Sequence, residues 1–247
     1  MQRLSCSSGS SRNRAGARLV KVVGLGAGGH AKAVIEAIQL SGAHEVVGLL
    51  DRDPALKGQF VLDVPVLGGD ELLPGLKAKG IGGVFIGVGS VGDAAGRVRL
   101  YERAIAEGLE AVSVTHPDAV VSPSASIGAG TVILARAVIN PEAALGVNVI
   151  INSGAVVEHD CAIGDHAHIA TGACLAGGVR VGDRAHVGVG ASVKQGIAIG
   201  SGAIVGGGAA VVEDVPAGAT VVGVPARPLM KSRRQSALTQ GPLGRAS

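Results

Sequence analysis

The stretch Val121 to Ala210 reads VSPSAS IGAGTV ILARAV INPEAA LGVNVI INSGAV VEHDCA IGDHAH IATGAC LAGGVR VGDRAH VGVGAS VKQGIA IGSGAI VGGGAA, in one register of six. Every hexad of this stretch begins with Val, Ile or Leu, and its fifth residue is small or aliphatic. Neither the helical period of about 3.6 residues nor the strand period of about 2 fits this pattern. A fixed short repeat predicts a solenoid, and a hexapeptide repeat predicts a parallel β-helix.

The interior of such a solenoid is narrow, which limits the side chains that fit inside it. We expect the first and fifth residues of each hexad to point inward, and glycine to occupy corners that need positive φ or close backbone approach. The composition agrees, because the chain has 41 glycines and only 1% aromatic residues. A disordered Gly/Ala/Val-rich segment is the alternative, but disorder would not keep a register.

The hexads, with Leu, Ile or Val first, Gly or Ala second and a small residue fifth, resemble the left-handed β-helix acyltransferases. In that family three hexads form one triangular coil, so the resemblance implies that the hexads of residues 121–210 stack as five coils. It also implies a homotrimer, with active sites between neighbouring prisms.

The N-terminal part reads as an α/β unit with a glycine-rich first turn. Residues 19–25 predict a buried strand, GLGAGGH over Gly24 to His30 predicts a turn, and a helical pattern then leads to a strand over 46–50 and Asp51. The glycines match the G-x-G-x-x-G pattern, which lets backbone N–H groups and a helix N-terminus face a phosphate. The pattern alone does not choose between a dinucleotide, a mononucleotide and a turn that needs glycine only for packing.

The rest of this part offers few further strands. We predict a strand over 64–68, a helix over 70–79 capped by Asp70, a strand over 83–88 and a basic helix over 93–107. About three parallel strands are then expected, which is half of a dinucleotide fold. This half-Rossmann domain suits one nucleotide, so an NAD-dependent dehydrogenase is the least favoured function. Arg97 or Arg99 in the basic helix would add positive charge to the nucleotide site.

Three segments carry a more specific resemblance: the turn Gly26 to His30, the strand end Ile86 to Ser90, and Thr115-His116-Pro117 before the hexads. In this order they resemble the sialic acid O-acetyltransferase NeuD family, which includes PglD-type N-acetyltransferases of nucleotide-linked 4-amino sugars. The resemblance covers residues 19–230. It implies acetyl-CoA as co-substrate and a nucleotide-activated amino sugar as acceptor. The residues that it implies for binding the sugar nucleotide are Gly26, Gly28, Gly29, His30 and Asp51.

Histidines stand out among the hexads, whose other variable positions are mostly Gly, Asp, Asn or Ser. A solenoid needs no imidazole at its corners. Acetyl transfer from a thioester does need a base, because the attacking amine or hydroxyl loses a proton, and histidine titrates near working pH. His159 is the third residue of its hexad, where we expect its side chain to point outward to the next subunit. A neighbouring carboxylate would fix the tautomer of such a base.

The family resemblance assigns roles to these residues. Its motif of a histidine followed by an acidic residue implies His159 as general base and Asp160 as the acid that orients it, with Glu158 as the alternative acid. Gly177 follows His159 by three hexads, which places it one coil further on at the same corner, and its N–H is expected to donate to the oxyanion. The residues implied for binding acetyl-CoA are His168, Gly177 and Arg227, the last in the closing sequence GVPAR.

Composition limits the remaining possibilities. The net charge of +3 argues against a nucleic-acid partner, and no apolar run is long enough to span a membrane. Three cysteines without paired or metal-type spacing predict a reduced, cytoplasmic protein with no metal site, and Cys161 and Cys174 occupy interior-type hexad positions. The predicted parts are a disordered leader (1–18), the α/β domain (19–114), the β-helix (115–230) and a disordered tail (231–247).

Three other functions compete with N-acetylation. The first keeps the fold and acetyl-CoA but uses a hydroxyl acceptor, as in sialic acid O-acetylation. The second is a non-catalytic trimeric scaffold. The third is a zinc protein of the carbonic-anhydrase type, which would draw its ligands from His159, His166, His168 and His186. The histidine spacing favours the acetyltransferase.

Overall fold

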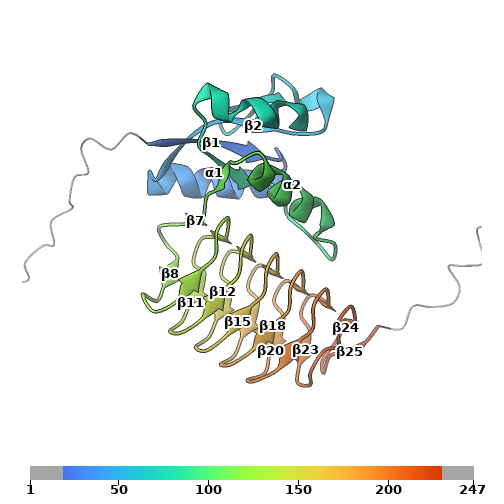
Figure 1. Ribbon diagram of the computed structural model, residues 1–247. Coiled ribbons are helices and arrows are strands. Elements are labelled where there is room, and N and C mark those ends of the chain that lie inside the picture. Colours follow the sequence, from blue (N-terminus) through green and yellow to red (C-terminus); the bar gives the residue numbers. More distant parts are fainter. Residues whose placement is uncertain (1–18, 230–247) are drawn as a thin grey trace, which may run out of the picture.

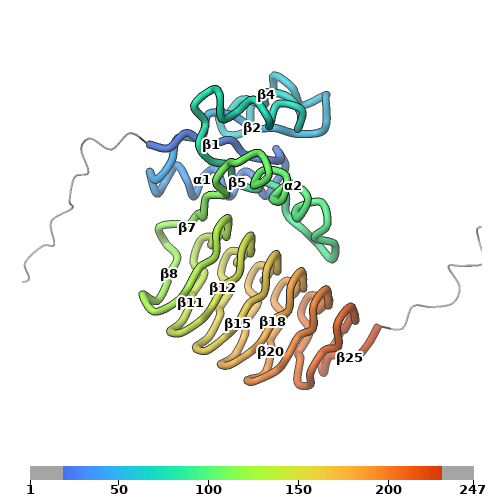
Figure 2. Tube along the Cα trace, in the orientation of Figure 1, coloured from blue at the N-terminus to red at the C-terminus, as the bar shows by residue number. Residues whose placement is uncertain are grey.

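The computed structural model describes residues 19–229 in two stacked parts, an N-terminal α/β layer and a solenoid (Figure 1). The α/β layer lies over one side of the solenoid, whose coils follow one another in a row towards the C-terminal end (Figure 2). The predicted leader over 1–18 and tail over 231–247 lie outside the described residues. No helix within 19–229 is both long and apolar enough to cross a bilayer.

The α/β layer is built on one six-stranded sheet with the strand order β3-β4-β2-β1-β5-β6. Only β3 is antiparallel to its neighbour, so five strands are parallel and the prediction of about three is wrong. The two-residue strand β6 has no apolar run that would reveal it. The elements are β1 (Val20–Leu25), α1 (Gly29–Ser41), β2 (His44–Leu50), β3 (Phe60–Val61), β4 (Val64–Gly68), β5 (Gly83–Ile86), α2 (Ala95–Ala106) and β6 (Glu110–Ala111).

Apolar side chains cover both faces of this sheet. On one face α1 contributes Val34 and Ile35 to a core that continues onto Val132 and Leu134 of the solenoid. On the other face Ala104 of α2 belongs to a separate core. Because the first core crosses from the α/β layer into the β-helix, the two parts share buried apolar surface.

The segment between β4 and β5 differs from its prediction. The expected helix over 70–79 is wrong, because two short 3₁₀ helices, η2 (Asp70–Gly75) and η3 (Lys77–Lys79), occupy this segment. Pro74 lies inside η2, and a proline has no N–H to continue a hydrogen-bonded helix. The N-cap is Gly69 rather than Asp70. Another 3₁₀ helix, η1 (Pro54–Leu56), follows β2.

The solenoid is a parallel β-helix with three faces, each a ladder of short strands. The strands pair in parallel with the strand one coil further on, as Ile150 pairs with His168, apart from the antiparallel hairpin over 220–228 that ends the first face. The first face contains β7 (Val114–Thr115), β10 (Val132–Ile133), β13 (Ile150–Ile151), β16 (His168–Ile169), β19 (His186–Val187), β22 (Ile204–Val205), β24 (Thr220–Val222) and β25 (Arg227–Pro228). The second face contains β8 (Val120–Val121), β11 (Val138–Ile139), β14 (Val156–Val157), β17 (Cys174–Leu175), β20 (Ser192–Val193) and β23 (Ala210–Val211). The third face contains β9 (Ser126–Ile127), β12 (Ala144–Leu145), β15 (Ala162–Ile163), β18 (Arg180–Val181) and β21 (Ala198–Ile199).

The inward positions agree with the hexad rule. First and fifth residues such as Ile151, Ala155 and Val157 are fully buried in one core along the axis. Cys161, a fifth residue, is buried as predicted. The interior position predicted for Cys174 is wrong, because it is exposed. Cys174 is a sixth residue and precedes the inward Leu175 on the same strand. Because neighbouring strand residues point to opposite sides, Cys174 points outward.

The fourth hexad residues have a left-handed backbone from Gly130 to Gly208. Glycine occupies most of these corner positions, as the sequence predicts. This conformation costs an L side chain roughly 1–2 kcal/mol, although Asn and Asp tolerate it better. A residue other than glycine at such a corner therefore suggests another role for its side chain. These residues are Arg136, Glu142, Asn148, Asp160, His166 and Arg184.

The α/β layer contacts one side of the triangular prism. Ser90 meets His168 on the first face, and Arg97 reaches the backbone at Asn148, on the corner between the third and first faces. The turn that contains His159 joins β14 to β15 and so forms the corner between the second and third faces. That corner is opposite the first face. Within one chain, the α/β layer and His159 therefore lie on opposite sides of the prism.

Candidate active site

His159 projects from its corner into solvent, with 57% of its side chain exposed. Its Nδ1 lies 2.7 Å from Oδ2 of Asp160, so the short aspartate does reach the ring. This hydrogen bond raises the pKa of His159 above its usual value, with smaller help from the charges of Asp160 and Glu158. Glu158 instead accepts a hydrogen bond from the backbone N–H of His159. Asp160 is thus the carboxylate that orients the imidazole.

The backbone of Asp160 explains how adjacent residues can make this contact. Asp160 has φ 60°, in the left-handed region that most fourth hexad residues fill with glycine. Aspartate is one of the few side chains that tolerate this region. With Nδ1 donating to the carboxylate, Nε2 of the neutral ring carries the free lone pair. The corner therefore presents a basic nitrogen outward.

Gly177 lies against this nitrogen from the next coil. A Cβ at Gly177 would come within 2.6 Å of both Cε1 and Nε2 of His159. No φ in the left-handed region demands glycine here, so the ring itself is what requires the missing side chain. No backbone carbonyl in the described part of the chain accepts a hydrogen bond from the Gly177 N–H. The predicted oxyanion role of this N–H needs such a free donor.

His168 lies in a different environment, buried on the first face under the α/β layer with 6% of its surface exposed. Its Nδ1 donates to the Ser90 carbonyl at 2.6 Å, so its Nε2 can accept from the Asn152 amide at 3.3 Å. The ring of His186 stacks edge-on against it at 4.9 Å. Burial lowers the pKa of His168 to about 3, which keeps it neutral. Asn152, which precedes His168 by almost one coil, was not identified from the sequence.

A cleft of about 730 Å³ opens beside the glycine turn of the α/β layer. The residues predicted to bind the sugar nucleotide all line it: Gly26, Gly28, Gly29, His30 and Asp51. Charged residues that the sequence did not single out for this site also line it: Arg52, Asp53, Asp70 and Arg103. Arg99, a candidate from the basic helix, is there too. Their strands and helices are distant in sequence, and only the fold brings them to one cleft.

The glycines of the turn do not all serve packing. Gly26 has φ 104°, and a Cβ there would collide with Val88 at 2.5 Å, so the fold itself requires this glycine. A Cβ at Gly28 or Gly29 would meet nothing within 4 Å. The N-cap of α1, Gly28, makes no side-chain hydrogen bond, which leaves first-turn N–H groups open beside the cleft. Such an uncapped helix start is suited to a phosphate.

Asp51, just after β2, and His30, in the first turn of α1, both line this cleft. The Asp51 carboxylate accepts hydrogen bonds from the backbone N–H groups of Ala27 and Asp53, at 2.8 and 2.9 Å. Asp51 therefore holds the glycine turn to the end of β2. His30 is partly buried, and desolvation of its ring together with the charge of Arg97 lowers its pKa to about 4. Its Nε2 has no hydrogen-bond partner among residues 19–229.

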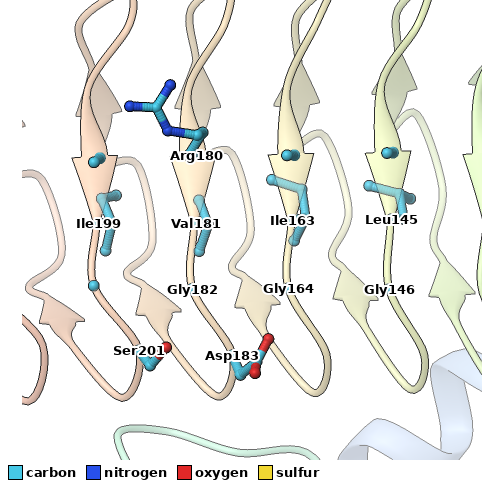
Figure 3. A pocket seen from close by; sticks show the side chains of 14 residues that line it. Leu145, Gly146, Ile163, Gly164, Arg180, Val181, Gly182, Asp183, Ile199 and Ser201 are labelled. Atoms are coloured by element: carbon cyan, nitrogen blue, oxygen red, sulfur yellow. The ribbon is translucent and has the colours of Figure 1, made fainter.

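A shallow groove of about 540 Å³ runs along the third face, from outward sixth residues such as Ala162 to the corner between the third and first faces. Its outward residues are mostly alanine and glycine. The exceptions are Arg180 on β18 and the shorter Asp183 and Ser201 in the adjoining turns, and Figure 3 shows the long Arg180 side chain projecting from its strand. Arg180 was not identified from the sequence, although it interrupts a column of small sixth residues.

Arg227 lies on β25, at the far end of the solenoid (Figure 1). Its guanidinium is 3.6 Å from the Glu213 carboxylate and is more than half exposed. Glu213 follows β23, and three strand spacings, or about 14 Å along the axis, separate β23 from β14, the strand before His159.

No three His, Cys, Asp or Glu side chains in the described part of the chain come together to hold a metal ion.

Two features define the class of this protein: a β-helix corner with a carboxylate-oriented histidine, and an α/β layer with an open glycine turn. Together they are typical of a β-helix acyltransferase that carries a nucleotide-binding domain. The PglD N-terminal domain profile matches residues 21–104. The chain belongs to the PglD-like family of sugar N-acetyltransferases, and its solenoid is the left-handed β-helix of that family.

Solved structures place the chain in this family. PerB from Caulobacter crescentus, crystallised with CoA and GDP-perosamine, is 42% identical, with a TM-score of 0.79 over 87% of this chain and 100% of PerB. The acetyltransferase domain of PglB from Neisseria gonorrhoeae, crystallised with acetyl coenzyme A, is 38% identical, with a TM-score of 0.80 over 86% and 100%. WeeI from Acinetobacter baumannii is 26% identical, with a TM-score of 0.57 over 85% and 100%. The comparison with curated proteins gives no match.

Proposed function

We propose that this protein transfers the acetyl group of acetyl-CoA to the amino group of a nucleotide-linked 4-amino sugar. The observation that carries the proposal is the His159–Asp160 pair set against Gly177. The cleft beside the open glycine turn supplies a place for the nucleotide. The ligands of the relatives, CoA with GDP-perosamine in PerB and acetyl coenzyme A in the PglB domain, support the same pair of substrates.

The geometry suits direct transfer. Nε2 of His159 takes a proton from the sugar amine as its nitrogen attacks the thioester carbonyl carbon. The carbonyl oxygen becomes an oxyanion, which the N–H of Gly177 stabilises. The C–N bond forms, the C–S bond breaks, and CoA leaves with a proton as the free thiol. The products are the N-acetylated sugar nucleotide and CoA, with no acyl-enzyme intermediate.

We also propose that the active site needs two copies of the chain, in a homotrimer. The nucleotide cleft belongs to the α/β layer, which contacts the first face, whereas His159 is on the opposite corner of the same prism. A sugar held in the cleft therefore meets the His159 of a neighbouring copy. Three prisms arranged around an axis would give each cleft one such neighbour.

Acetyl-CoA is proposed to lie in the groove of the third face, because the third face begins at the His159 corner. Its smooth Ala and Gly surface leaves room for an extended pantetheine chain, and Arg180 offers a cation to a CoA phosphate. Arg227 extends the basic surface towards the end of the solenoid. The contact predicted for His168 would have to come from a partner copy, since His168 lies on the first face.

The test incubates the full-length protein with acetyl-CoA and a panel of GDP-, UDP- and CMP-linked sugars, while free thiol is followed. We expect thiol release with 4-amino sugars and none with their 4-hydroxy counterparts. In His159→Ala, turnover should fall at least about 100-fold, the scale of general base catalysis, while light scattering still shows a trimer. Unchanged turnover in this variant would remove the mechanism, and release only with sialic acids would favour O-acetylation.

Thermal-shift measurements identify the nucleotide carrier independently of turnover. The nucleotide that binds should, at about 100 times its Kd, stabilise the protein by about 2.7 kcal/mol, and nucleotides that do not bind should leave its stability unchanged.

We further propose a cytoplasmic location, because Cys161 and Cys174 are both free thiols, as expected in a reducing compartment.

A further inference from the structure

Arg97 is a buried cation without a buried anion beside it. It belongs to α2 and is only 1% exposed. Its guanidinium donates to the backbone carbonyls of Asn148 and His166, and more weakly to that of Ala167 at 3.4 Å. No salt bridge to Arg97 occurs among the residues that the structure describes. Burial lowers the pKa of Arg97 to about 10, so it stays protonated near neutral pH.

The carbonyls that Arg97 contacts belong to two consecutive coils. Asn148 and His166 are fourth hexad residues, three hexads apart on the corner between the third and first faces. Within 19–229, no backbone N–H donates to either carbonyl. The β-helix thus leaves an outward acceptor on each coil at this corner, and neighbouring coils lie about 4.8 Å apart. The two terminal nitrogens of one guanidinium satisfy both acceptors at once.

The side chains of this corner are fitted to α2 as well. The Asn148 amide lies 3.0 Å from Nδ1 of His166, and the His166 ring meets Tyr101 edge-on at 5.5 Å. Tyr101 follows Arg97 by one helical turn, so both lie on the same side of α2. Both corner residues also adopt the left-handed backbone in which glycine is favoured. This clamp, made of Arg97, Tyr101, Asn148 and His166, joins the α/β layer to the β-helix.

The same helix forms a wall of the nucleotide cleft. Gly96, Arg99 and Arg103 of α2 line the cleft, and so does Gly89 next to the Ser90 carbonyl that binds His168. We propose that Arg97 is a positioning residue: by bridging two coils it sets the cleft relative to the β-helix, so that the bound sugar amine reaches the partner copy's base. This inference rests on the proposed function.

Lysine cannot replace Arg97 in this role. An ammonium is a single centre on a flexible stem, whereas the planar guanidinium presents two terminal nitrogens in a fixed geometry. Arg97→Lys keeps the charge and the aliphatic stem but should lose the hydrogen bond to the carbonyl of one of the two coils. Arg97→Met loses both contacts and leaves two carbonyls unpaired. The two variants therefore separate the bridging geometry from the presence of a cation.

The experiment measures nucleotide affinity, turnover and backbone protection in the full-length parent, Arg97→Lys and Arg97→Met. For both variants we expect kcat to fall about 100-fold, the effect of misplacing a reactant by about 1 Å, with the nucleoside diphosphate Kd within about twofold of the parent. Hydrogen exchange in residues 87–94 should become faster, since this loop lies between the clamp and the cleft. Arg184→Lys, on the same corner one coil beyond His166, should match the parent.

Two results would overturn the proposal: parent-like kcat in a folded Arg97→Lys, or a nucleotide Kd that weakens as much as kcat. If Arg97→Met does not fold, Arg97→Lys alone decides. If the parent acetylates no sugar nucleotide, the proposed function fails. Hydrogen exchange needs no substrate, so it still tests the clamp in that case. Unchanged exchange in residues 87–94 would then remove the positioning role.

Discussion

The imidazole of His159 occupies the space where a side chain of Gly177 would lie, since a Cβ on that glycine would be 2.6 Å from Nε2. The base and the proposed oxyanion donor therefore belong to consecutive coils of one corner. Coils repeat at a fixed spacing of about 4.8 Å, so the β-helix itself sets the distance between the two groups. The absence of a side chain at Gly177 is then as important as the presence of the imidazole.

Gly177→Ala should abolish most of the activity with little loss of stability. Alanine can adopt the backbone of Gly177, which is not left-handed, but its methyl group would displace the exposed ring of His159. We expect kcat to fall at least about 100-fold, as for loss of the base, with an unchanged urea midpoint.

The neighbouring Gly178→Ala is the matched control for this variant. Gly178 has φ 68° and nothing within 4 Å of a Cβ. Alanine there should cost roughly 1–2 kcal/mol of stability through its backbone and leave kcat close to the parent value. Equal activity in the two variants would contradict the steric role assigned to Gly177.

Asp160→Asn should move the pH dependence of turnover. The Asp160 carboxylate raises the pKa of His159, and a general base must be neutral, so the acid limb of kcat/KM lies above the ordinary histidine value of 6.5. Without the carboxylate the pKa falls, and the limb should move to lower pH. The plateau should also drop, because the tautomer is no longer fixed.

Glu158→Gln tests the other carboxylate in the same pH series. The Glu158 carboxylate accepts a hydrogen bond from the backbone N–H of His159, and its charge is the smallest of the effects that raise the ring's pKa. We expect a smaller displacement of the acid limb than in Asp160→Asn. A larger one would return the orienting role to Glu158.

Mild acid should destabilise the contact between the α/β layer and the β-helix. Burial lowers the pKa values of His30 and His168 to about 4 and about 3, so an unfolded chain binds protons at these residues below pH 6.5 and the folded chain does not. Each histidine then lowers the free energy of unfolding by at most about 1.4 kcal/mol for each pH unit below 6.5. Arg97 and His186 beside His168 disfavour its protonation further.

Urea denaturation at pH 7 and pH 5 checks this dependence. The midpoint should fall on acidification, and His168→Gln, which removes one of the histidines whose pKa burial lowers, should show a smaller fall. The same fall in both proteins would show that His168 does not contribute to the acid sensitivity.

Arg180→Ala should weaken the binding of acetyl-CoA without affecting the binding of the sugar nucleotide. Loss of a charge-assisted hydrogen bond to a phosphate, worth about 1.5–3 kcal/mol, should raise the KM for acetyl-CoA at least about tenfold. The KM for the sugar nucleotide and kcat should stay unchanged. Acetyl-pantetheine has no phosphate, so with this donor the variant should equal the parent. A defect that persists with acetyl-pantetheine would show that Arg180 does not act on a phosphate.

The sequence by itself determined the β-helix and the groups at its corner. A period of six fits neither the helical nor the simple strand period, and it is the repeat typical of a parallel β-helix. In that fold an offset of three hexads puts Gly177 over His159. The glycine turn after the first strand could also be predicted from the sequence, because a strand, a glycine run and a helix are local patterns. Asp160 was assigned from the family resemblance, whose motif places an acidic residue after the histidine, although its reach depended on a backbone angle that the sequence does not display.

Only the tertiary structure decided how the two parts meet. The five parallel strands, the burial of His168 beneath Ser90 and the clamp of Arg97 on Asn148 and His166 all join residues distant in sequence. Arg97 stood in a basic helix like any exposed arginine, and no local pattern says which carbonyls a buried guanidinium will find. Periodicity fixes contacts at a constant offset along the chain, whereas contacts between separate elements follow from packing in three dimensions.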